Sequence, residues 1–370
     1  MKRIIVSVTN DLTTDQRVHK ICSCLHEEGF SITLIGRKLK NSAPLSREYK
    51  TSRMRLLFTK GFAFYAEYNI RLFFKLLFLK KDILIANDLD TLLPNYINHK
   101  ISRSKLVYDS HELFTEVPEL IHRPKVQNIW LSIEKYIFPK LKNVYTVNDI
   151  IANIYAKKYH VNVGVIRNIA PKIKNNSVDK ALIEKTKGNQ KMIILQGAGI
   201  NIDRGGEEAV EMMQYLEDTV LYIIGSGDVF PILKEKVKTL KLENKVFLLG
   251  RRPYNELMEY TKIADLGLSL DKNTNLNYEY SLPNKIFDYI QARVPLLVSN
   301  RKIIANIVKK NDIGLVTESH DPKVLATTVS KILKDEERLK SWKKNIIIAA
   351  DKYNWELESE KLKTIYRNLK

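Results

Sequence analysis

Residues 191–227 read KMIILQGAGINIDRGGEEAVEMMQYLEDTVLYIIGSG and have the pattern of a strand, a helix and a second strand. Two continuous apolar runs, KMIILQG (191–197) and TVLYIIGSG (219–227), flank a more polar helical segment. Strands that are apolar without alternation are typical of parallel sheets covered by helices on both faces. This stretch therefore predicts an α/β fold with a Rossmann-like sheet.

The same alternation of strands and helices runs through the whole chain and falls into two sets. Besides the two runs above, the expected strands are RIIVSVT (3–9), SITLIGR (31–37), DILIAND (82–88), KLVYDSH (105–111), NVYTVND (143–149), KVFLLG (245–250), ADLGLSL (264–270) and VPLLVSN (294–300). Two sets predict two Rossmann-like domains, residues 1–168 and 191–354, joined by a polar linker region at 169–190. Ligands bind beyond the carboxyl ends of parallel strands, so we expect the domains to face each other across a cleft that holds the site.

The composition narrows the class of protein. The 370 residues are 44% hydrophobic and 28% charged, as in an ordinary globular protein, and the net charge of +19 suggests an anionic partner. Nucleic acid, an anionic bilayer and a phosphorylated substrate all fit that charge. Cys22 and Cys24 form neither a disulfide framework nor a zinc site, which favours a reducing compartment. No secretory signal or membrane span is expected.

The segment SLPNKIFDYIQ (281–291) places a lysine where a helix begins. Ser281 and Pro283 predict the helix start, so Lys285 lies in the first turn, where the helix dipole disfavours a cation by up to about 1 kcal/mol. Either Lys285 is a mobile surface side chain, or an anion binds beside it. Backbone amides and Lys285 together suit a diphosphate, and Asp288, on the same helix face, suits ribose hydroxyls. The alternative is a surface Lys285–Asp288 pair.

Motifs along nearly the whole chain resemble those of retaining glycosyltransferases of the family 4 type, which have the GT-B fold. The segment SLPNKIFDYIQARVPLLVSN (281–300) is similar to the donor-binding segment of that family. The other similar stretches are TNDLTTDQRVHKICSCLHEEGFSITLIGR (9–37), IANDLDTL (85–92), KLVYDSHELFTEVPEL (105–120), YTVNDIIANIYAKKY (145–159), QGAGINIDRGGEEAVEMM (196–213), YIIGSGD (222–228) and YNWELESEKLKTIYRNL (353–369). The resemblance implies an acceptor domain, a nucleotide-sugar donor domain and a C-terminal helix, about 355–370, that crosses back to the first domain.

The resemblance assigns donor-site residues in the second domain. Arg204, before Gly205, matches the basic residue that binds the donor diphosphate, and Ala198 stands where the family has a second basic residue. Lys285 is expected to supply that missing charge, and Asp288 matches the ribose ligand. The remaining nucleotide-side predictions are Gly199, Gly225, Gly227 and Arg251, with Arg252 beside it.

The sugar and acceptor sides follow from the same resemblance. Tyr280 stands where the family has a glutamate that contacts the donor sugar, with Glu279 adjacent, and the sequence leaves open whether Tyr280 replaces it. His111 matches the histidine that reaches the transferred sugar. The acceptor-side predictions are Thr13, Asp15 and Arg17, with a helix cap as the alternative for Asp15. We interpret Asp88 and Asp90 as loop and cap residues rather than a metal motif.

The predicted function is transfer of a sugar, with retention, from a nucleotide-diphosphate sugar to a glycan or lipid-linked acceptor, and a UDP-sugar is the expected donor. Polysaccharide or lipopolysaccharide synthesis is the expected setting, without cofactor or metal. The basic aromatic segment 53–81 predicts an anionic membrane surface as a partner, so the protein is expected in the cytoplasm on the inner face of the membrane. No nucleic-acid partner is expected. The alternatives are a nucleotide-sugar epimerase of the same fold and a non-catalytic basic binding protein.

Overall fold

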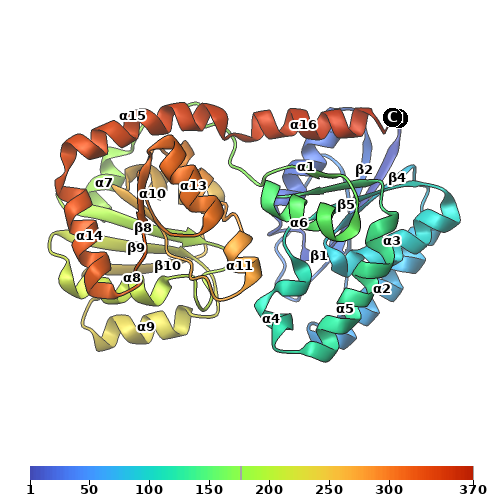
Figure 1. Cartoon of the computed structure of the whole chain (residues 1–370), viewed down its shortest axis with the longest axis horizontal. Coiled ribbons are helices and arrows are strands. Elements are labelled where there is room, and N and C mark those ends of the chain that lie inside the picture. The colour runs from blue at the N-terminus through green and yellow to red at the C-terminus, as the bar shows by residue number, and fades with distance from the viewer. Residues whose placement is uncertain (176, 370) are drawn as a thin grey trace. The chain divides into compact units, whose positions relative to one another are not determined.

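The computed structural model describes residues 1–175 and 177–369, which divide into two compact units (Figure 1). The first unit holds residues 1–168 together with the chain from Glu358 onward, and the second holds Ile169–Leu357. Residues 169–190, expected as a linker, are counted with the second unit and include helix α7 (Lys180–Thr186). Residue 176 of the expected linker and residue 370 of the expected terminal helix lie outside the described residues.

The first unit is built on a seven-stranded parallel sheet with the order β3-β2-β1-β4-β5-β6-β7. The strands are β1 (Arg3–Asp11), β2 (Ser31–Arg37), β3 (Lys50–Met54), β4 (Ile83–Asn87), β5 (Lys105–Ser110), β6 (Asn143–Thr146) and β7 (Val163–Val165). The helices are α1 (Gln16–Glu27), α2 (Gly61–Phe78), α3 (Leu89–Ser102), α4 (Pro118–Ile121), α5 (Pro124–Ile137), α6 (Asp149–Tyr159) and most of α16 (Trp355–Arg367). Figure 1 shows helices on both faces of the sheet.

The second unit has a six-stranded parallel sheet with the order β10-β9-β8-β11-β12-β13. Its strands are β8 (Lys191–Gly197), β9 (Thr219–Gly225), β10 (Val246–Gly250), β11 (Leu266–Ser269), β12 (Leu296–Ser299) and β13 (Gly314–Thr317). After α7 its helices are α8 (Gly206–Met212), α9 (Phe230–Thr239), α10 (Tyr254–Ile263), α11 (Leu276–Tyr280), α12 (Lys285–Gln291), α13 (Lys302–Asn311), α14 (Pro322–Lys334) and α15 (Glu336–Lys352). Among the helices of the described residues, none combines the length and the apolarity needed to cross a bilayer.

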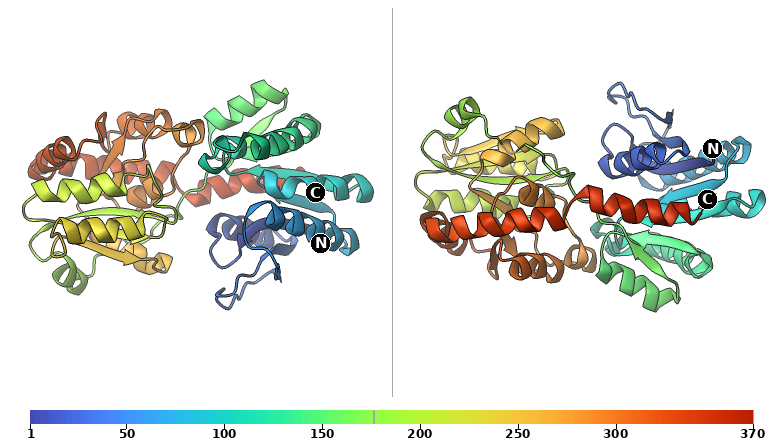
Figure 2. Two further views of the ribbon diagram at one scale, coloured as in Figure 1. Left: turned by 90° about the horizontal axis from the view of Figure 1, so that it is seen from below. Right: turned by 90° about the horizontal axis from the view of Figure 1, so that it is seen from above.

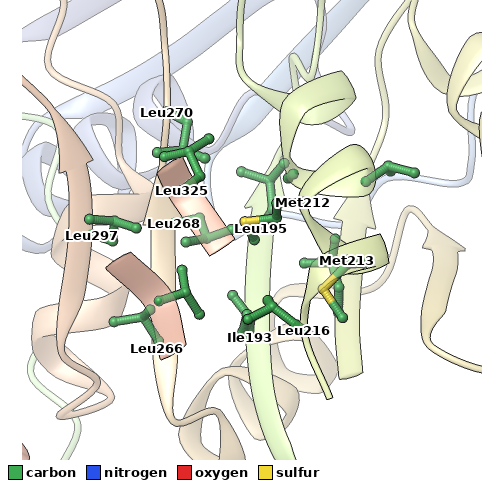
Figure 3. Close-up of a cluster of buried hydrophobic side chains, with 14 of the residues drawn as sticks. Ile193, Leu195, Met212, Met213, Leu216, Leu266, Leu268, Leu270, Leu297 and Leu325 are labelled. Carbon is green, nitrogen blue, oxygen red and sulfur yellow. The ribbon is translucent and has the colours of Figure 1, made fainter. Parts of the chain in front are cut away.

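The apolar core of the second unit explains why its strands are apolar at every position. Ile193 and Leu195 of β8 point to the same side as Leu266 and Leu268 of β11, where they pack against helix side chains such as Met212 (Figure 3). The intervening residues of the same strands, among them Ile194, fill a second core cluster. With both faces buried, a strand gains hydrophobic stabilisation from every residue, and the alternation seen in half-exposed strands is absent.

The end of the chain is part of the first unit. Both termini lie there (Figure 2), and the amines of Lys2 and Lys105 donate to the Leu369 carbonyl oxygen at 3.1 and 2.8 Å. Tyr366 of α16 is fully buried, with its hydroxyl 3.3 Å from that of Tyr145 and its ring edge-on to Phe30. The terminal helix is therefore a packed element of this unit.

Candidate functional site

Three cationic side chains of the second unit surround one buried carboxylate. Arg204 lies in the loop after β8, Asp271 follows β11 and Arg301 follows β12, so all three leave the carboxyl ends of neighbouring strands. Lys285 is the first residue of α12. Because the carboxyl ends of parallel strands meet at one edge of the sheet, side chains from four separate segments converge there.

Asp271 is the centre of this cluster. Its Oδ1 lies 3.0 Å from Arg204 Nη1, and its Oδ2 lies 3.4 Å from Lys285 Nζ and 3.7 Å from Arg301 Nη1. The Ser269 hydroxyl also donates to Oδ2 at 2.9 Å. Burial alone would raise the pKa of Asp271, but the three cations outweigh it and hold that pKa well below its usual range. The carboxylate is therefore ionised at neutral pH.

The position of Lys285 answers the question raised by its helix. The side chain is only 8% exposed, so it is not a mobile surface lysine, and the anion beside it is Asp271. Burial lowers the pKa of Lys285, an effect that Asp271 opposes. Ser281 does not cap the helix as expected: the residue at that position is Asn284, and Ser281 ends α11. Arg301 Nη2 donates instead to the Ser281 carbonyl and hydroxyl oxygens at 2.7 and 2.8 Å.

Glycines allow the loops around the cluster to approach closely. Gly205 has φ of +77°, and a Cβ there would lie 2.4 Å from Leu270 Cβ, so glycine lets Arg204 lie against the segment that carries Asp271. A Cβ on Gly227 would lie 1.8 Å from the Ile200 carbonyl oxygen, and one on Gly225 would lie 1.8 Å from Gly197. Gly225 and Gly227 are thus required for packing between the loops after β8 and β9. Gly199 has open space around its Cα.

The structure contradicts one of the two interpretations of Asp288. It is buried, which contradicts a surface pair with Lys285. One carboxylate oxygen accepts from Gln196 Nε2 at 3.0 Å and the other from the Tyr254 hydroxyl at 2.9 Å. Each carboxylate oxygen can accept a further hydrogen bond, so the contact of Asp288 with ribose hydroxyls stays a prediction.

The other residues predicted near the donor are dispersed. The Arg204 guanidinium stacks over the Tyr278 ring at 4.0 Å, whereas Tyr280 lies near Lys302 Nζ, 5.8 Å from its ring centre. Glu279 has a buried Oε2 without a hydrogen-bond partner among the described residues. Arg251 is exposed, and its neighbour Arg252 pairs with Glu256 on the protein surface.

His111 in the first unit is held between two carboxylates. Its backbone N–H donates to Asp88 Oδ1 at 2.7 Å, its Nδ1 lies 3.1 Å from Asp88 Oδ2, and its Nε2 lies 3.3 Å from Asp109 Oδ2. Burial would lower the pKa of His111, but Asp88 and Asp109 raise it well above its ordinary value. The two carboxylates therefore favour the protonated form of His111, and Asp88, at the N-cap position of α3, binds it instead of capping the helix.

Two of the three acceptor-side predictions have structural contacts of their own. Arg17 is buried, and its Nη2 pairs with Asp109 at 2.6 Å while its Nη1 donates to the Ile166 carbonyl. Its guanidinium fixes the carboxylate that holds His111. Asp15 accepts from the Val18 N–H as the cap of α1, which confirms the alternative reading of that residue.

Thr13 and Asp90 complete the carboxyl edge of the first sheet. Thr13 donates to Asp11 Oδ1 at 2.9 Å. Asp90 is buried in the first turn of α3 and accepts from Thr9 at 2.5 Å. Burial, together with the charge of Asp88, raises the pKa of Asp90 to about 8. Within residues 1–175 and 177–369, no group of three or more His, Cys, Asp or Glu side chains is arranged to hold a metal ion.

Four charged residues of these clusters were not selected from the sequence as site residues. They share one signal: each lies at or directly after the carboxyl end of a predicted strand. They are Asp88 after β4, Asp109 as the second-last residue of β5, Asp271 after β11 and Arg301 after β12. The rule that parallel strands deliver ligand-binding side chains at this edge would have found them.

One family model matches a large part of the second unit. Residues 179–348 match the family model described as Glycosyl transferases group 1. The matched residues lie within the second unit. No curated protein matches the sequence.

Solved structures show the same fold over the whole chain. Sucrose-phosphate synthase from Thermosynechococcus elongatus aligns with a TM-score of 0.80 at 15% identity, covering 100% of this chain and 99% of that one. HepE from Anabaena, solved with UDP and glucose, aligns with a TM-score of 0.77 at 13% identity, covering both chains completely. WaaG, described as a glycosyltransferase involved in lipopolysaccharide biosynthesis, aligns at 0.68 with 16% identity, covering 98% and 99%. The GT-B fold expected from the sequence is confirmed.

Proposed function

We propose that this chain transfers a sugar from a nucleoside diphosphate sugar to a glycan or lipid-linked acceptor with retention of configuration. The observation that carries the proposal is the cluster of Arg204, Lys285 and Arg301 around Asp271 within a glycosyltransferase group 1 domain. Its three cations exceed the single carboxylate by two charges. A diphosphate is the ligand class that such a surplus suits, because arginine and lysine both bind phosphate oxygens strongly.

In this reaction the cluster stabilises the leaving group. As the bond between the sugar C1 and the phosphate oxygen breaks, negative charge grows on the departing diphosphate. Arg204 and Lys285 act on that charge, and a fixed donor of this kind is worth about 3–4 kcal/mol of barrier. In the retaining mechanism that the family resemblance implies, the acceptor hydroxyl attacks from the same face and its proton passes to a diphosphate oxygen. The role of His111 on the transferred sugar stays a prediction of that resemblance.

UDP is the proposed nucleotide, and synthesis of cell-surface polysaccharide or lipopolysaccharide is the proposed setting. HepE, which shares the fold, was solved with UDP-glucose, and WaaG acts in lipopolysaccharide biosynthesis. The buried free thiols of Cys22 and Cys24 suit the cytoplasm. We also propose that no resident metal is needed, since cationic side chains supply the charge opposite the diphosphate.

The proposal is tested by following UDP-sugars by proton NMR with EDTA present. We expect a sugar to pass to an acceptor glycan or glycolipid fraction with an α-linked donor giving an α-linked product, at a rate that EDTA does not change. Appearance of a new free UDP-sugar without acceptor would favour the epimerase instead. An inverted product or a rate abolished by EDTA would contradict the proposed stereochemistry or metal independence.

We further propose that the first unit docks on an anionic membrane through α2, α3 and α5. These helices lie side by side in Figure 1 and pack against one another. Helix α2 buries every fourth residue from Phe64 to Leu76, yet its opposite side is also apolar, with Phe62 73% and Phe78 81% exposed. Further exposed apolar side chains are Ile70, Phe74, Ile97, Ile101, Ile129 and Tyr136.

Basic side chains surround this apolar surface. The exposed ones on the same three helices and their ends are Arg71, Lys80, Lys100, Arg103, Lys125, Lys135 and Lys140. Each basic residue close to an anionic leaflet contributes about 1 kcal/mol, and apolar side chains that enter the interface add hydrophobic stabilisation. An anionic bilayer fits both features, because its head groups attract the basic side chains and its interface accepts the apolar ones.

The double variant Phe74→Glu/Phe78→Glu is expected to bind vesicles of phosphatidylcholine with one-third phosphatidylglycerol about 10²-fold more weakly than the wild type. Two aromatic side chains lose their burial in the interface, and two anions enter it. Co-sedimentation measures the partition coefficient. The control, Ile348→Glu, changes an exposed apolar residue of α15 in the second unit and should bind as the wild type does. Equal loss in both variants would contradict the assignment.

A further inference from the structure

The donor-site cluster contains its own anion. Asp271 uses both carboxylate oxygens, Oδ1 toward Arg204 and Oδ2 toward Lys285 and Arg301. It is 1% exposed and fixed by the Ser269 hydroxyl, so it cannot swing away into water. The same cations that a diphosphate would use are therefore already shared with a protein carboxylate.

The cluster also has more donors than Asp271 satisfies. Among the described residues, Arg204 Nε and the Nε and Nη1 atoms of Arg301 are buried and have no hydrogen-bond partner. Buried polar donors are almost always paired in native proteins, so three orphaned guanidinium N–H groups at one place point to a ligand that supplies further acceptors. A carboxylate offers two oxygens, and a diphosphate offers several more.

The backbone keeps this arrangement rigid. Gly205 lies directly against Leu270, the residue before Asp271, and Arg301 is tied to Ser281 by two hydrogen bonds from Nη2. These contacts restrict the positions of Arg204 and Arg301. A diphosphate that binds the same cations must lie beside the Asp271 carboxylate. The two anions then repel each other, and the repulsion is strong because the site is poorly solvated.

We propose that Asp271 is a built-in counter-ion that competes with the diphosphate for Arg204, Lys285 and Arg301. This inference rests on the proposed function of the site. While the site is empty, Asp271 neutralises part of the charge and holds the cations in position. Once the sugar has been transferred, Asp271 lowers the affinity of the site for the nucleoside diphosphate product and so promotes its release.

The test compares Asp271→Asn with the wild type in titration calorimetry, with inorganic pyrophosphate and UDP as separate ligands. Asparagine keeps the shape of the side chain but removes its charge, so we expect both ligands to bind at least tenfold more tightly. Inhibition by UDP as a product should strengthen by the same factor. A merely structural aspartate would give equal or weaker binding on substitution, and that result would overturn the proposal.

Asp265→Asn is the matched control, because β11 has one aspartate directly before it and another, Asp271, two residues after its end. Asp265 pairs with Lys187 at 2.7 Å at the other end of this strand. Asp265→Asn removes a carboxylate that pairs with a lysine, as Asp271→Asn does, but leaves the donor-site cluster unchanged. Pyrophosphate and UDP affinities should stay within about twofold of the wild type.

A second variant keeps the test decisive if Asp271→Asn fails to fold. Asp271→Asn/Arg301→Gln removes one anion and one cation, so the net charge of the cluster is that of the wild type. The competition account still expects tighter pyrophosphate binding, because Arg204 and Lys285 are no longer shared. Weaker binding than in the wild type would contradict it. Failure of the proposed function has a different signature: UDP would then bind no better than pyrophosphate in any variant.

Discussion

Replacing Lys285 by alanine is expected to lower the rate of sugar transfer about 10²–10³-fold. The ammonium group is buried at the carboxyl edge of the second sheet, where it lies 3.4 Å from Asp271 Oδ2. In such a site a single fixed donor to the leaving group is worth about 3–4 kcal/mol, which corresponds to this loss of rate. Steady-state kinetics with the donor identified by NMR measures the effect.

The Lys285→Ala variant should remain folded, so the loss is interpretable. Asp271 keeps Arg204 and Arg301 as partners, and removal of a buried lysine relieves the cost of burying its charge. Lys234→Ala, on the exposed side of α9, is the control and should be as active as the wild type. Equal activity of Lys285→Ala and the control would show that Lys285 does not act on the leaving group.

Replacing Asp109 by asparagine is expected to destabilise the first unit by about 3–5 kcal/mol. Asp109 is fully buried and pairs with both Arg17 and His111. Its neutralisation leaves the buried Arg17 guanidinium without its ionic partner, and an uncompensated buried charge has a cost of this size. Hydrogen exchange of the β4 and β5 amides, followed by mass spectrometry, measures the free energy of opening of this unit.

The effect of Asp109→Asn should depend on pH in a defined direction. Burial would raise the pKa of Asp109, but Arg17 and His111 outweigh it and lower that pKa in the folded protein. The stability that Asp109 contributes is therefore present above its unfolded pKa of about 3.9 and is lost as the pH falls toward the folded value. The difference between the variant and the wild type should be full at pH 7 and smaller near pH 3.

An exposed pair provides the control for Asp109→Asn. Asp149 pairs with Arg167 at 3.0 Å on the surface of the same unit, and its carboxylate is 71% exposed. Because exposed ion pairs contribute about 1 kcal/mol or less, Asp149→Asn should change the exchange of the β5 amides little. A similar small change for Asp109→Asn would contradict the role of Asp109 as the centre of the Arg17–His111 network.

The strands that the sequence did not predict are all at sheet edges. β3 and β7 end the first sheet, and β13 ends the second. β3 (KTSRM) is polar, and β7 (VGV) and β13 (GLVT) are short apolar stretches, so none of them shows the long apolar run by which a central strand is recognised. Pairing to one neighbour supports these strands, and a single sequence does not reveal that pairing. The central strands were predictable because both of their faces are buried.

The sequence indicated cationic side chains at this site but did not reveal the carboxylate with which they pair. Lys285 in a first helical turn and Arg204 before Gly205 indicated an anion site, and the structure brings these two side chains to one carboxylate. Asp271 was missed because it lies 14 residues from Lys285 and 67 from Arg204 in the chain. Arg17 was predicted on the acceptor side, and its ion pair with Asp109 was missed, since nothing in its local sequence shows that partner.

The most direct test of the donor site is thermal stabilisation by UDP, GDP, ADP and TDP, measured for the wild type and Lys285→Ala. A nucleotide present at about 100 times its Kd should add roughly 2.7 kcal/mol to the free energy of unfolding. We predict a shift with UDP that is lost or strongly reduced in Lys285→Ala. No shift of the wild type with any of the four nucleotides would contradict the assignment of the Arg204–Lys285–Arg301 cluster as a donor diphosphate site.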